Sequence, residues 1–300
     1  FRTPFWGPLS GLKATVGGGL SQNSVFWGSG QYGSAADCVL SLDVVLADGS
    51  VLSTGSASQC NSTPFFRHYG PDLTGLFTCD TGALGFKATA TLPLIPDLVA
   101  KEYLSFDFKD AASAIAAMSD VARHKLAMEC FAFDPFLQRQ RLKRQSLSAD
   151  LTALVGVMTS SSSALGAIGA GAKVALAGRS FMDDVNFSVQ FIVEDRNKAA
   201  AVDRATDIRK FCSEHGGTEI PNSIPMVTRS NPFGPLNSML GPEGERFLPI
   251  HGLFPHSRIQ KAYLAVEDLF DRHRKRSEKL GIGIGYLFTT VAANGFILEP

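Results

Sequence analysis

Two glycine-rich segments most constrain how the first third of this 300-residue chain can fold. The first reads Thr15-Val-Gly-Gly-Gly-Leu-Ser-Gln-Asn-Ser24, and the second reads Cys79-Asp-Thr-Gly-Ala-Leu-Gly-Phe86. Glycine has no side chain, so backbone N–H groups at such positions can approach an anionic or planar ligand closely. Strand-forming sequence separates the two segments. We therefore expect two glycine-rich turns that lie side by side and line one elongated cofactor.

The surrounding motifs give these segments a family context. In order, the chain carries Val16-Gly-Gly-Gly-Leu-Ser21 with Asn23 and Tyr32-Gly33, then Val39 to Gly49, then Gly70 to Leu92. This order resembles the second half of the FAD-binding domain of the vanillyl-alcohol oxidase and p-cresol methylhydroxylase (PCMH) superfamily, which includes D-lactate and glycolate dehydrogenases. The resemblance implies FAD as the cofactor. It also implies cofactor contacts, largely through backbone groups, from Thr15, Gly17, Gly18, Gly19, Ser21, Asn23, Ser24, Tyr32, Gly33, Thr81, Gly82, Ala83, Leu84, Gly85 and Phe86.

The match to this family has two departures. Relatives often read Gly-Ser-Glu-Gly-Thr-Leu-Gly in the third motif, whereas this chain reads Cys79-Asp-Thr-Gly-Ala-Leu-Gly85, so a contact from that glutamate is not carried over. The upstream FAD subdomain of the family has no counterpart here, and we interpret the sequence as a fragment that lacks it. As an alternative, the glycines serve only strand-to-strand turns. We interpret Asp48-Gly49 as a hairpin turn.

Composition indicates a globular protein whose partners are not polyanions. The chain has 45% hydrophobic residues, and 28 basic residues balance 28 acidic ones, so no overall field attracts nucleic acid. Five scattered cysteines without a Cys-x-x-Cys pair argue against a disulfide framework or a thiolate metal site, and no metal is predicted. We expect a cytoplasmic location, with attachment to the periphery of the inner membrane as an alternative. Ser160 to Gly178 is predicted to be a loosely packed excursion.

Chain length and hydrophobic periodicity predict an α+β fold with two domains, over residues 1–97 and 98–300. The resemblance implies that the first is the second subdomain of an FAD-binding domain and that the second is a substrate-binding cap. A strand over Glu102–Phe108, a helix near Asp110 and a strand over Ala127–Phe133 form one unit. A strand over Val185–Val193 and a helix capped by Asp195, ending at Gly216-Gly217, form a second unit. Two such units favour a ferredoxin-like domain. This agrees with the cap domain of the PCMH-type superfamily.

A third helix is predicted from Ser257 toward Leu280, with a solvated basic turn over residues 272–276. The segment before this helix holds the candidate catalytic residues His251, His256 and Arg258. In the functional hypothesis, His251 or His256 removes a hydroxyl proton while hydride passes from carbon to flavin N5, and Arg258 pairs with a carboxylate. In the alternative, these residues serve capping, packing and solvation.

The resemblance implies an FAD-dependent oxidoreductase that acts on CH–OH groups of a small alcohol or hydroxy acid. Its electron acceptor would be a quinone, a cytochrome or oxygen, and a homodimer is compatible with the family. A 2-hydroxy acid of the D-lactate or glycolate type is one predicted substrate. A phenolic alcohol oxidase or hydroxylase is the second hypothesis. The third is a degenerate relative that retains the fold as a binding module.

Overall fold

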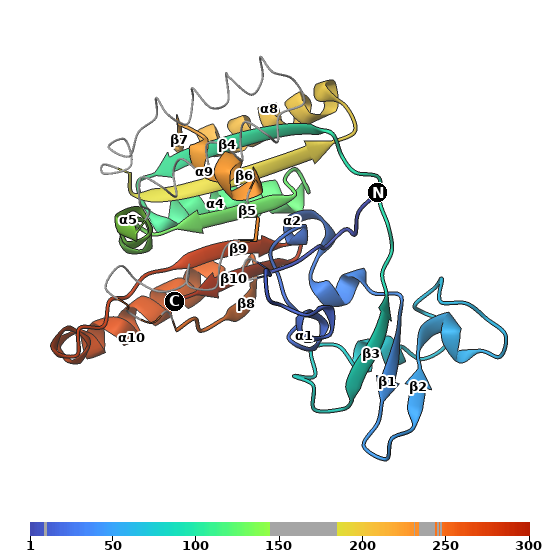
Figure 1. Cartoon of the computed structure of the whole chain (residues 1–300). Helices are drawn as coiled ribbons and strands as arrows, with labels where there is room; N and C mark the ends of the chain where they lie inside the picture. Colours follow the sequence, from blue (N-terminus) through green and yellow to red (C-terminus); the bar gives the residue numbers. More distant parts are fainter. Residues whose placement is uncertain (9–10, 145–184, 231, 234–243, 245, 247) are drawn as a thin grey trace. The chain divides into compact units, whose positions relative to one another are not determined.

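The structure is a computed structural model that describes residues 1–300 except 9–10, 145–184, 231, 234–243, 245 and 247 (Figure 1). Its described residues form two compact units. The first comprises Phe1–Asp97 together with Phe233, and the second comprises the other described residues from Leu98 onward. The excursion predicted over residues 160–178 lies outside the described residues.

The first unit pairs a small sheet with short helices. Strands β1 (Ser41–Val45), β2 (Val51–Ser53) and β3 (Phe86–Thr91) form an antiparallel sheet in the order β2-β1-β3. The helices are α1 (Val16–Ser21), α2 (Ser29–Tyr32) and α3 (Leu73–Leu76), with 3-10 turns at Ala35–Cys38 and Gly55–Ser58. One small core joins them, formed by Leu20, Ala35, Val39, Leu42, Val44 and Phe77. The predicted hairpin at Asp48-Gly49 is confirmed, since β1 and β2 pair antiparallel across it.

The first glycine-rich segment is not the predicted turn, because Val16–Ser21 forms helix α1. Glycine is a poor helix former, which favoured the turn prediction. The side chain of Thr15 caps this helix by accepting a hydrogen bond from the Gly18 N–H, at 3.0 Å. The helix also packs on β3, where a Cβ atom at Gly17 would lie 3.5 Å from the Lys87 carbonyl oxygen. Capping and tertiary packing together override the weak helix propensity.

The second unit is built on one seven-stranded sheet with the order β7-β4-β6-β5-β9-β10-β8. Its first four strands in the chain are β4 (Ala100–Phe108), β5 (Glu129–Phe133), β6 (Phe187–Asp195) and β7 (Thr218–Ile220). These four lie in the order β7-β4-β6-β5, with antiparallel pairing throughout, which is the ferredoxin-like arrangement. The predicted ferredoxin-like α+β fold is confirmed. Strands β8 (Gly252–Pro255), β9 (Leu287–Val291) and β10 (Gly295–Glu299) extend the sheet beyond β5.

The helices of this unit start largely where the sequence indicates. Helix α4 (Ala111–Arg123) begins after Asp110, whose side chain accepts from the Ser113 N–H as predicted. Helix α8 (Lys198–Glu214) is capped by Asn197 instead of the predicted Asp195, which ends β6 and pairs with Arg204 at 2.8 Å. Helix α10 spans Ile259–Lys279. Two further helices are α5 (Pro135–Arg144) and α9 (Ser223–Ser230).

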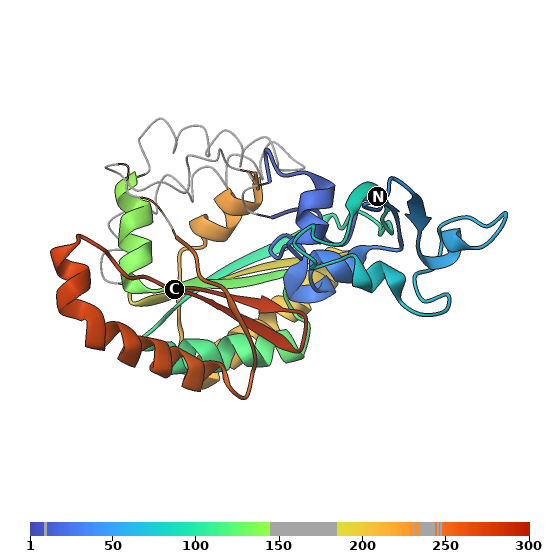
Figure 2. The ribbon, with the colours of Figure 1, turned by 90° about the horizontal axis from the view of Figure 1, so that it is seen from below.

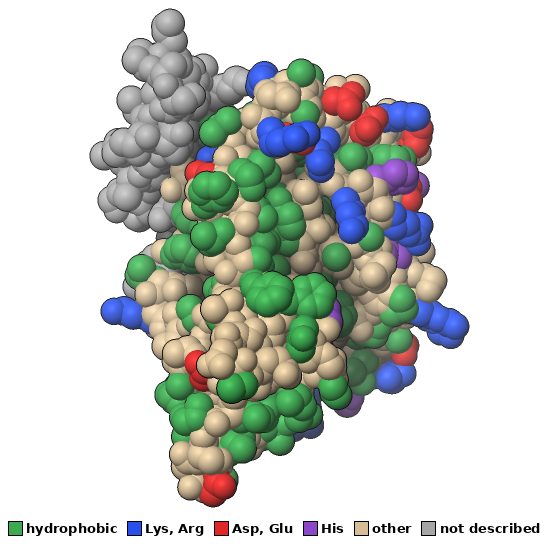
Figure 3. Space-filling view, turned by 90° about the vertical axis from the view of Figure 1, so that its right-hand side faces the viewer, with side chains coloured by type: hydrophobic (Ala, Val, Ile, Leu, Met, Phe, Trp, Pro, Cys, Tyr) green, Lys and Arg blue, Asp and Glu red, His purple; other side chains and the backbone are tan. Residues whose placement is uncertain are grey.

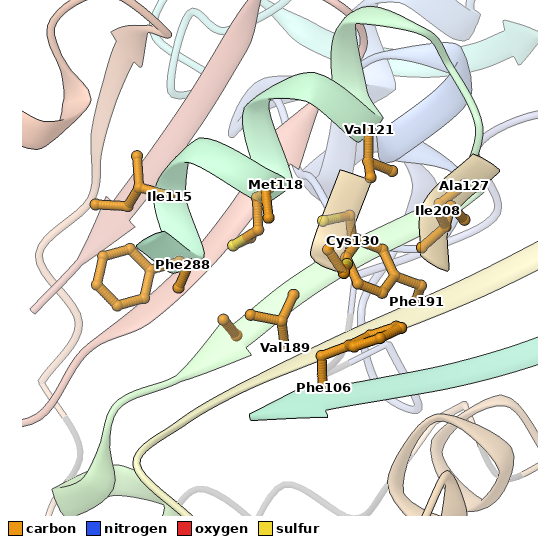
Figure 4. Packing of buried hydrophobic residues seen from close by; sticks show 14 of the residues in the cluster. Phe106, Ile115, Met118, Val121, Ala127, Cys130, Val189, Phe191, Ile208 and Phe288 are labelled. Carbon is orange, nitrogen blue, oxygen red and sulfur yellow. The ribbon is translucent and has the colours of Figure 1, made fainter. Parts of the chain in front are cut away.

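Three long helices cover one face of the sheet and bury a single large core (Figure 2). Val189 and Phe191 from β6, with Phe106 from β4, lie against Met118 and Val121 of α4 (Figure 4). Helices α8 and α10 add Ala201, Ala205, Ile208, Cys212 and Ile259 to this core. Helices α5 and α9 lie on the other side of the sheet (Figure 2). The same strands therefore have two differently covered faces.

Charged side chains of both signs lie next to one another in the upper and right-hand parts of the side seen in Figure 3, and hydrophobic side chains cover much of the rest. The basic turn of α10 follows this pattern, because Arg272 pairs with Asp268 and Arg274 with Asp271. All five cysteines have free thiols. In the part of the chain that the structure describes, no helix is long and apolar enough to cross a membrane, and no cluster of three or more metal-ligating side chains is found.

Candidate flavin and substrate site

Backbone hydrogen bonds bring the two glycine-rich segments together. The Cys79 N–H donates to the Leu20 carbonyl oxygen and the Thr81 N–H donates to the Ser21 carbonyl oxygen, both at 3.0 Å. The second segment therefore lies against the C-terminal end of α1. Cys79, Thr81 and Gly82 all have positive φ, so the chain makes a tight turn there. Residues Thr81 to Leu84 of this turn are exposed.

A buried ion pair holds this turn in shape, and we did not predict it. Asp80 accepts hydrogen bonds from the Gly82 and Leu84 N–H groups, at 3.0 and 3.3 Å. The Lys87 ammonium lies 2.7 Å from the same carboxylate, and both side chains are only 2% exposed. Burial favours the neutral acid, but Lys87 and the two N–H donors outweigh it and lower the pKa of Asp80.

The glycines of these segments differ in how much space a side chain would have at each position. A Cβ atom at Gly19 would lie 3.7 Å from Ser24, so neither packing nor backbone conformation requires glycine there. A Cβ atom at Gly82 would also have room, 4.0 Å from Ser21, but the φ of +79° at Gly82 favours glycine. A Cβ atom at Gly85 would clash with Val44 at 2.5 Å, and one at Gly33 would clash with Asp37 at 2.4 Å. These clashes explain why glycine is needed at positions 33 and 85 without any bound ligand. Gly19 and Gly82 keep space beside the backbone that a bound group could fill.

Two polar side chains of the first segment, Thr15 and Asn23, serve the fold of the unit itself. Thr15 caps α1, and the Asn23 side-chain oxygen accepts from the Ala36 N–H at 3.0 Å. The Ser24 carbonyl accepts from the Ala35 N–H, and the Tyr32 ring lies 6.0 Å from the Arg2 guanidinium carbon. Any cofactor contact from this segment would therefore come mainly from its backbone. Phe86, the last predicted contact, has a 73% exposed side chain.

Among the three predicted catalytic residues, His251 has an acidic partner. Its Nε2 atom lies 2.7 Å from a carboxylate oxygen of Glu299, the last residue of β10. The hydrogen bond from the Glu299 side chain raises the pKa of His251, although partial burial opposes the shift. The imidazole itself is 58% exposed. A histidine held in this way can accept and return a proton while the carboxylate fixes its orientation.

The structure does not place His256 or Arg258 beside His251 and Glu299. His256 faces the helices, with Nδ1 at 2.9 Å from the Ser119 hydroxyl of α4 and its ring against Phe296. Burial, followed by the nearby Arg123 charge, lowers the pKa of His256. Arg258 is exposed at the start of α10. This helix packs on the face of the sheet that α4, α8 and α10 cover, which we call the helix-covered face. His251 directly precedes β8, and alternation from Leu253, whose partner Ile297 pairs with Thr289, places it on the other face of the sheet.

That other face of the sheet carries buried polar groups that sequence reasoning missed. Strand register places Ser105, Gln190, Phe131 and Thr289 side by side in one row across β4, β6, β5 and β9. Further buried polar side chains of this face are Ser188, Glu129 and Glu194. Alternation within each strand was the available sequence signal, but we assigned no role to the polar residues between the apolar ones. The strand register and the burial of these side chains together show a buried polar surface.

An ion pair attaches helix α9 to this polar face. Arg229 of α9 lies 2.6 Å from the Glu194 carboxylate of β6. The Glu194 side chain is fully buried and the Arg229 side chain is 15% exposed. Nearby, the Asn222 side-chain amide donates to the Tyr103 carbonyl at 2.7 Å. Burial raises the pKa of Tyr103 to about 12, although the Arg229 charge opposes this.

Comparisons with known proteins agree with the cofactor prediction. Residues 3–55 match a family described as FAD binding domain. The glycolate oxidase subunit GlcD of Bacillus subtilis is 31% identical over 119 residues, which are 40% of this chain and 24% of that protein. A D-lactate dehydrogenase of Archaeoglobus fulgidus is 32% identical over 115 residues, 38% of this chain and 25% of that protein. The matched regions span about a quarter of these curated relatives.

Solved structures extend the similarity over the whole chain. The structure of p-cresol methylhydroxylase with substrate bound has a TM-score of 0.67 at 14% identity, over 100% of this chain and 56% of that one. An alkyldihydroxyacetonephosphate synthase structure has a TM-score of 0.63 at 18% identity, over 98% of this chain and 49% of that one. The match of residues 3–55 to the FAD binding domain family identifies FAD as the cofactor. The similarity of this chain to the superfamily of FAD-linked oxidases is therefore confirmed.

Proposed function

We propose that this chain forms part of an FAD-dependent oxidoreductase that oxidises a 2-hydroxy acid of the D-lactate or glycolate type. The main support is that two glycine-rich segments, about 60 residues apart, are joined by backbone hydrogen bonds, and the first lies inside the region that matches an FAD binding domain. The glycolate oxidase subunit and D-lactate dehydrogenase support the substrate class. The reaction also needs an acceptor such as a quinone, a cytochrome or oxygen.

The residues present fit FAD as the bound group. Gly19 and Gly82 leave space beside half-buried or exposed backbone. Lys87 neutralises Asp80, so no unpaired carboxylate of this turn opposes an anionic cofactor. We assign the backbone of Gly17 to Gly19 and of Thr81 to Ala83 to the cofactor. When bound, FAD would supply the hydride acceptor for the oxidation. The rest of the chemistry must come from protein side chains.

His251 is the proposed proton acceptor for the substrate hydroxyl. Its neutral form is the one that accepts a proton, and its raised pKa makes it a stronger base that becomes available at higher pH. Glu299 would hold the ring and stabilise the imidazolium after proton transfer. His256, with a lowered pKa and a partner on the helix side, supports the packing role instead.

Replacing glycine by alanine separates cofactor binding from folding. Gly19→Ala should stabilise the cofactor-free protein by about 0.5–1 kcal/mol, because alanine favours a helix and the added Cβ has room. The same methyl group should weaken FAD binding if the cofactor lies against this backbone. Thermal unfolding without FAD and an FAD titration measure the two effects. Higher stability with unchanged FAD affinity would remove Gly19 from the site.

The function itself is tested by a visible absorbance spectrum followed by anaerobic addition of substrates. A flavin spectrum that bleaches with D-lactate or glycolate is the expected result. Bleaching only with a para-substituted benzyl alcohol would favour the phenolic reaction, which the p-cresol methylhydroxylase fold similarity keeps as the second candidate. A protein that stays colourless after FAD addition would indicate the binding module.

A further inference from the structure

The polar face of the seven-stranded sheet holds a side-chain amide that the fold orients but leaves unpartnered. Gln190, in the middle of β6, is fully buried. Its Oε1 atom accepts a hydrogen bond from the Ser105 hydroxyl of β4 at 2.5 Å. Its Nε2 atom has no hydrogen-bond partner among the residues that the structure describes. A buried N–H donor without an acceptor is costly, so such groups are rare unless a water or a ligand satisfies them.

A second group of the same kind lies two residues earlier on the same strand. Ser188 is fully buried, and its hydroxyl has no partner within the described part of the chain. Ser188 and Gln190 point to the same face, because residues two apart in a strand do so. Phe131 and Phe133 of β5 lie beside them in register. Two hydrogen-bonding groups beside two aromatic rings resemble the lining of a small-molecule site more than a packed core.

The orientation of the amide decides which ligand atom it can bind. Because Ser105 occupies the amide oxygen, the free end of Gln190 is an N–H donor, and it requires an acceptor oxygen. The carboxylate Glu194 of this face is already paired with Arg229. Arg258, which we had expected to bind the substrate carboxylate, lies at the start of a helix on the opposite face. The polar face therefore lacks that arginine but offers this amide.

We propose that Gln190 is a substrate-binding residue that donates a hydrogen bond from Nε2 to an acceptor oxygen of the substrate, with Ser188 beside it and Ser105 as the positioning residue. This inference rests on the proposed function, since it assigns a hydroxy acid as the ligand. A hydroxy acid has the required chemistry, because its carboxylate oxygens accept hydrogen bonds and a small apolar remainder can contact the phenylalanine rings.

Two variants of Gln190 test the hydrogen bond in the FAD-loaded protein. Gln190→Leu keeps the volume but removes the donor, and it should raise KM for D-lactate or glycolate about ten- to a hundredfold with a smaller change in kcat. Gln190→Glu can only accept a hydrogen bond while its carboxyl is ionised, so it should bind poorly at a pH above the pKa of that carboxyl. It should recover as the pH falls, because a protonated carboxyl donates again. A packing residue would not show this recovery.

Thr290→Val is the matched control. Thr290 is a buried strand residue of β9 that alternation places on the helix-covered face, away from Gln190. We expect an unchanged KM for this variant. Equal losses in Thr290→Val and Gln190→Leu, or a wild-type KM in both Gln190 variants, would overturn the inference. Ser105→Ala should weaken binding less than Gln190→Leu, because it only frees the amide to rotate.

A direct probe separates this inference from the proposed function. The side-chain amide signal of Gln190 in an NMR spectrum can be assigned by its loss in Gln190→Leu, and it should shift when D-lactate, glycolate or a para-substituted benzyl alcohol is added. If no hydroxy acid is oxidised, the proposed function is wrong, yet a shift with any of these ligands still supports the binding role. An amide signal that stays in place with all three ligands excludes it.

Discussion

The two faces of the seven-stranded sheet use alternate residues of the same strands and have opposite chemistry. In one row, Phe106, Val189, Ala132 and Phe288 pack beneath the helices. In the adjacent row, Ser105, Gln190, Phe131 and Thr289 form the polar face. Both rows are buried. Burial of a strand residue therefore does not reveal its role here. The helix-covered face stabilises the fold, and we assign the other face to ligand recognition.

The largest expected effect is on the helix-covered face. Phe191→Ala should lower the free energy of unfolding by about 3–5 kcal/mol, because it leaves a cavity in a fully buried core. Chemical denaturation followed by far-UV circular dichroism measures this loss. Leu264→Ala on the exposed side of α10 is the control and should change stability by no more than about 0.5 kcal/mol. Similar losses in both variants would contradict a core centred on this face.

The second largest expected loss of stability comes from breaking the ion pair between Arg229 and Glu194 on the polar face. Arg229→Met leaves the buried Glu194 carboxylate without this partner, which should cost about 3 kcal/mol. The double variant Arg229→Met with Glu194→Leu should recover much of the loss, since no isolated charge then stays buried. The same denaturation experiment on the four proteins of this cycle gives the coupling. If the two single losses of unfolding free energy add up to the loss in the double variant, Arg229 and Glu194 do not stabilise each other.

The smallest expected effect is a difference in pKa between two histidines, one from each face of the sheet. His251 should titrate above the ordinary histidine pKa of about 6.5 and His256 below it. The Glu299 contact therefore stabilises the fold at low pH and loses this effect as the pH rises through the raised pKa. Burial of neutral His256 acts in the opposite direction, because its destabilising protonation begins below about pH 6.5. Histidine NMR titrations measure both values.

Glu299→Gln is the matched variant for this titration. It should return the pKa of His251 toward the ordinary value and leave that of His256 unchanged. If His251 is the proton acceptor, the pH at which kcat/KM rises should fall by the same amount. A pH profile that does not follow the His251 titration would remove this residue from the reaction.

The order of the ferredoxin-like elements could be predicted because each has a local signal. Apolar alternation marks β4 and β6, and the Asp110 side chain marks the start of α4. Helix α1 was missed because three consecutive glycines oppose a helix, and only the Thr15 cap and packing against β3 favour it. The cap of α8 was misplaced by two residues because Asp195 and Asn197 are both good capping residues.

The candidate site was harder to predict, because its key relations join distant residues. The glycine-rich segments could be expected to meet, but the Asp80–Lys87 pair that shapes the second one depends on how a turn folds back onto β3. His251 was a candidate from its residue type, whereas its pairing with Glu299 needs the register of β8 on β10. The polar row through Gln190 needs the register of four strands.

The Asp80–Lys87 pair has a consequence for how strongly dissolved salt should affect cofactor retention. The two charges cancel inside the protein, and the segment from Thr15 to Ser24 contains no charged residue. A dinucleotide held by these two segments would meet neutral backbone donors instead of a patch of positive charge. Mobile ions weaken attraction between separated, exposed charges far more than short hydrogen bonds. The retention of FAD by this part of the protein should accordingly change little between low and high ionic strength.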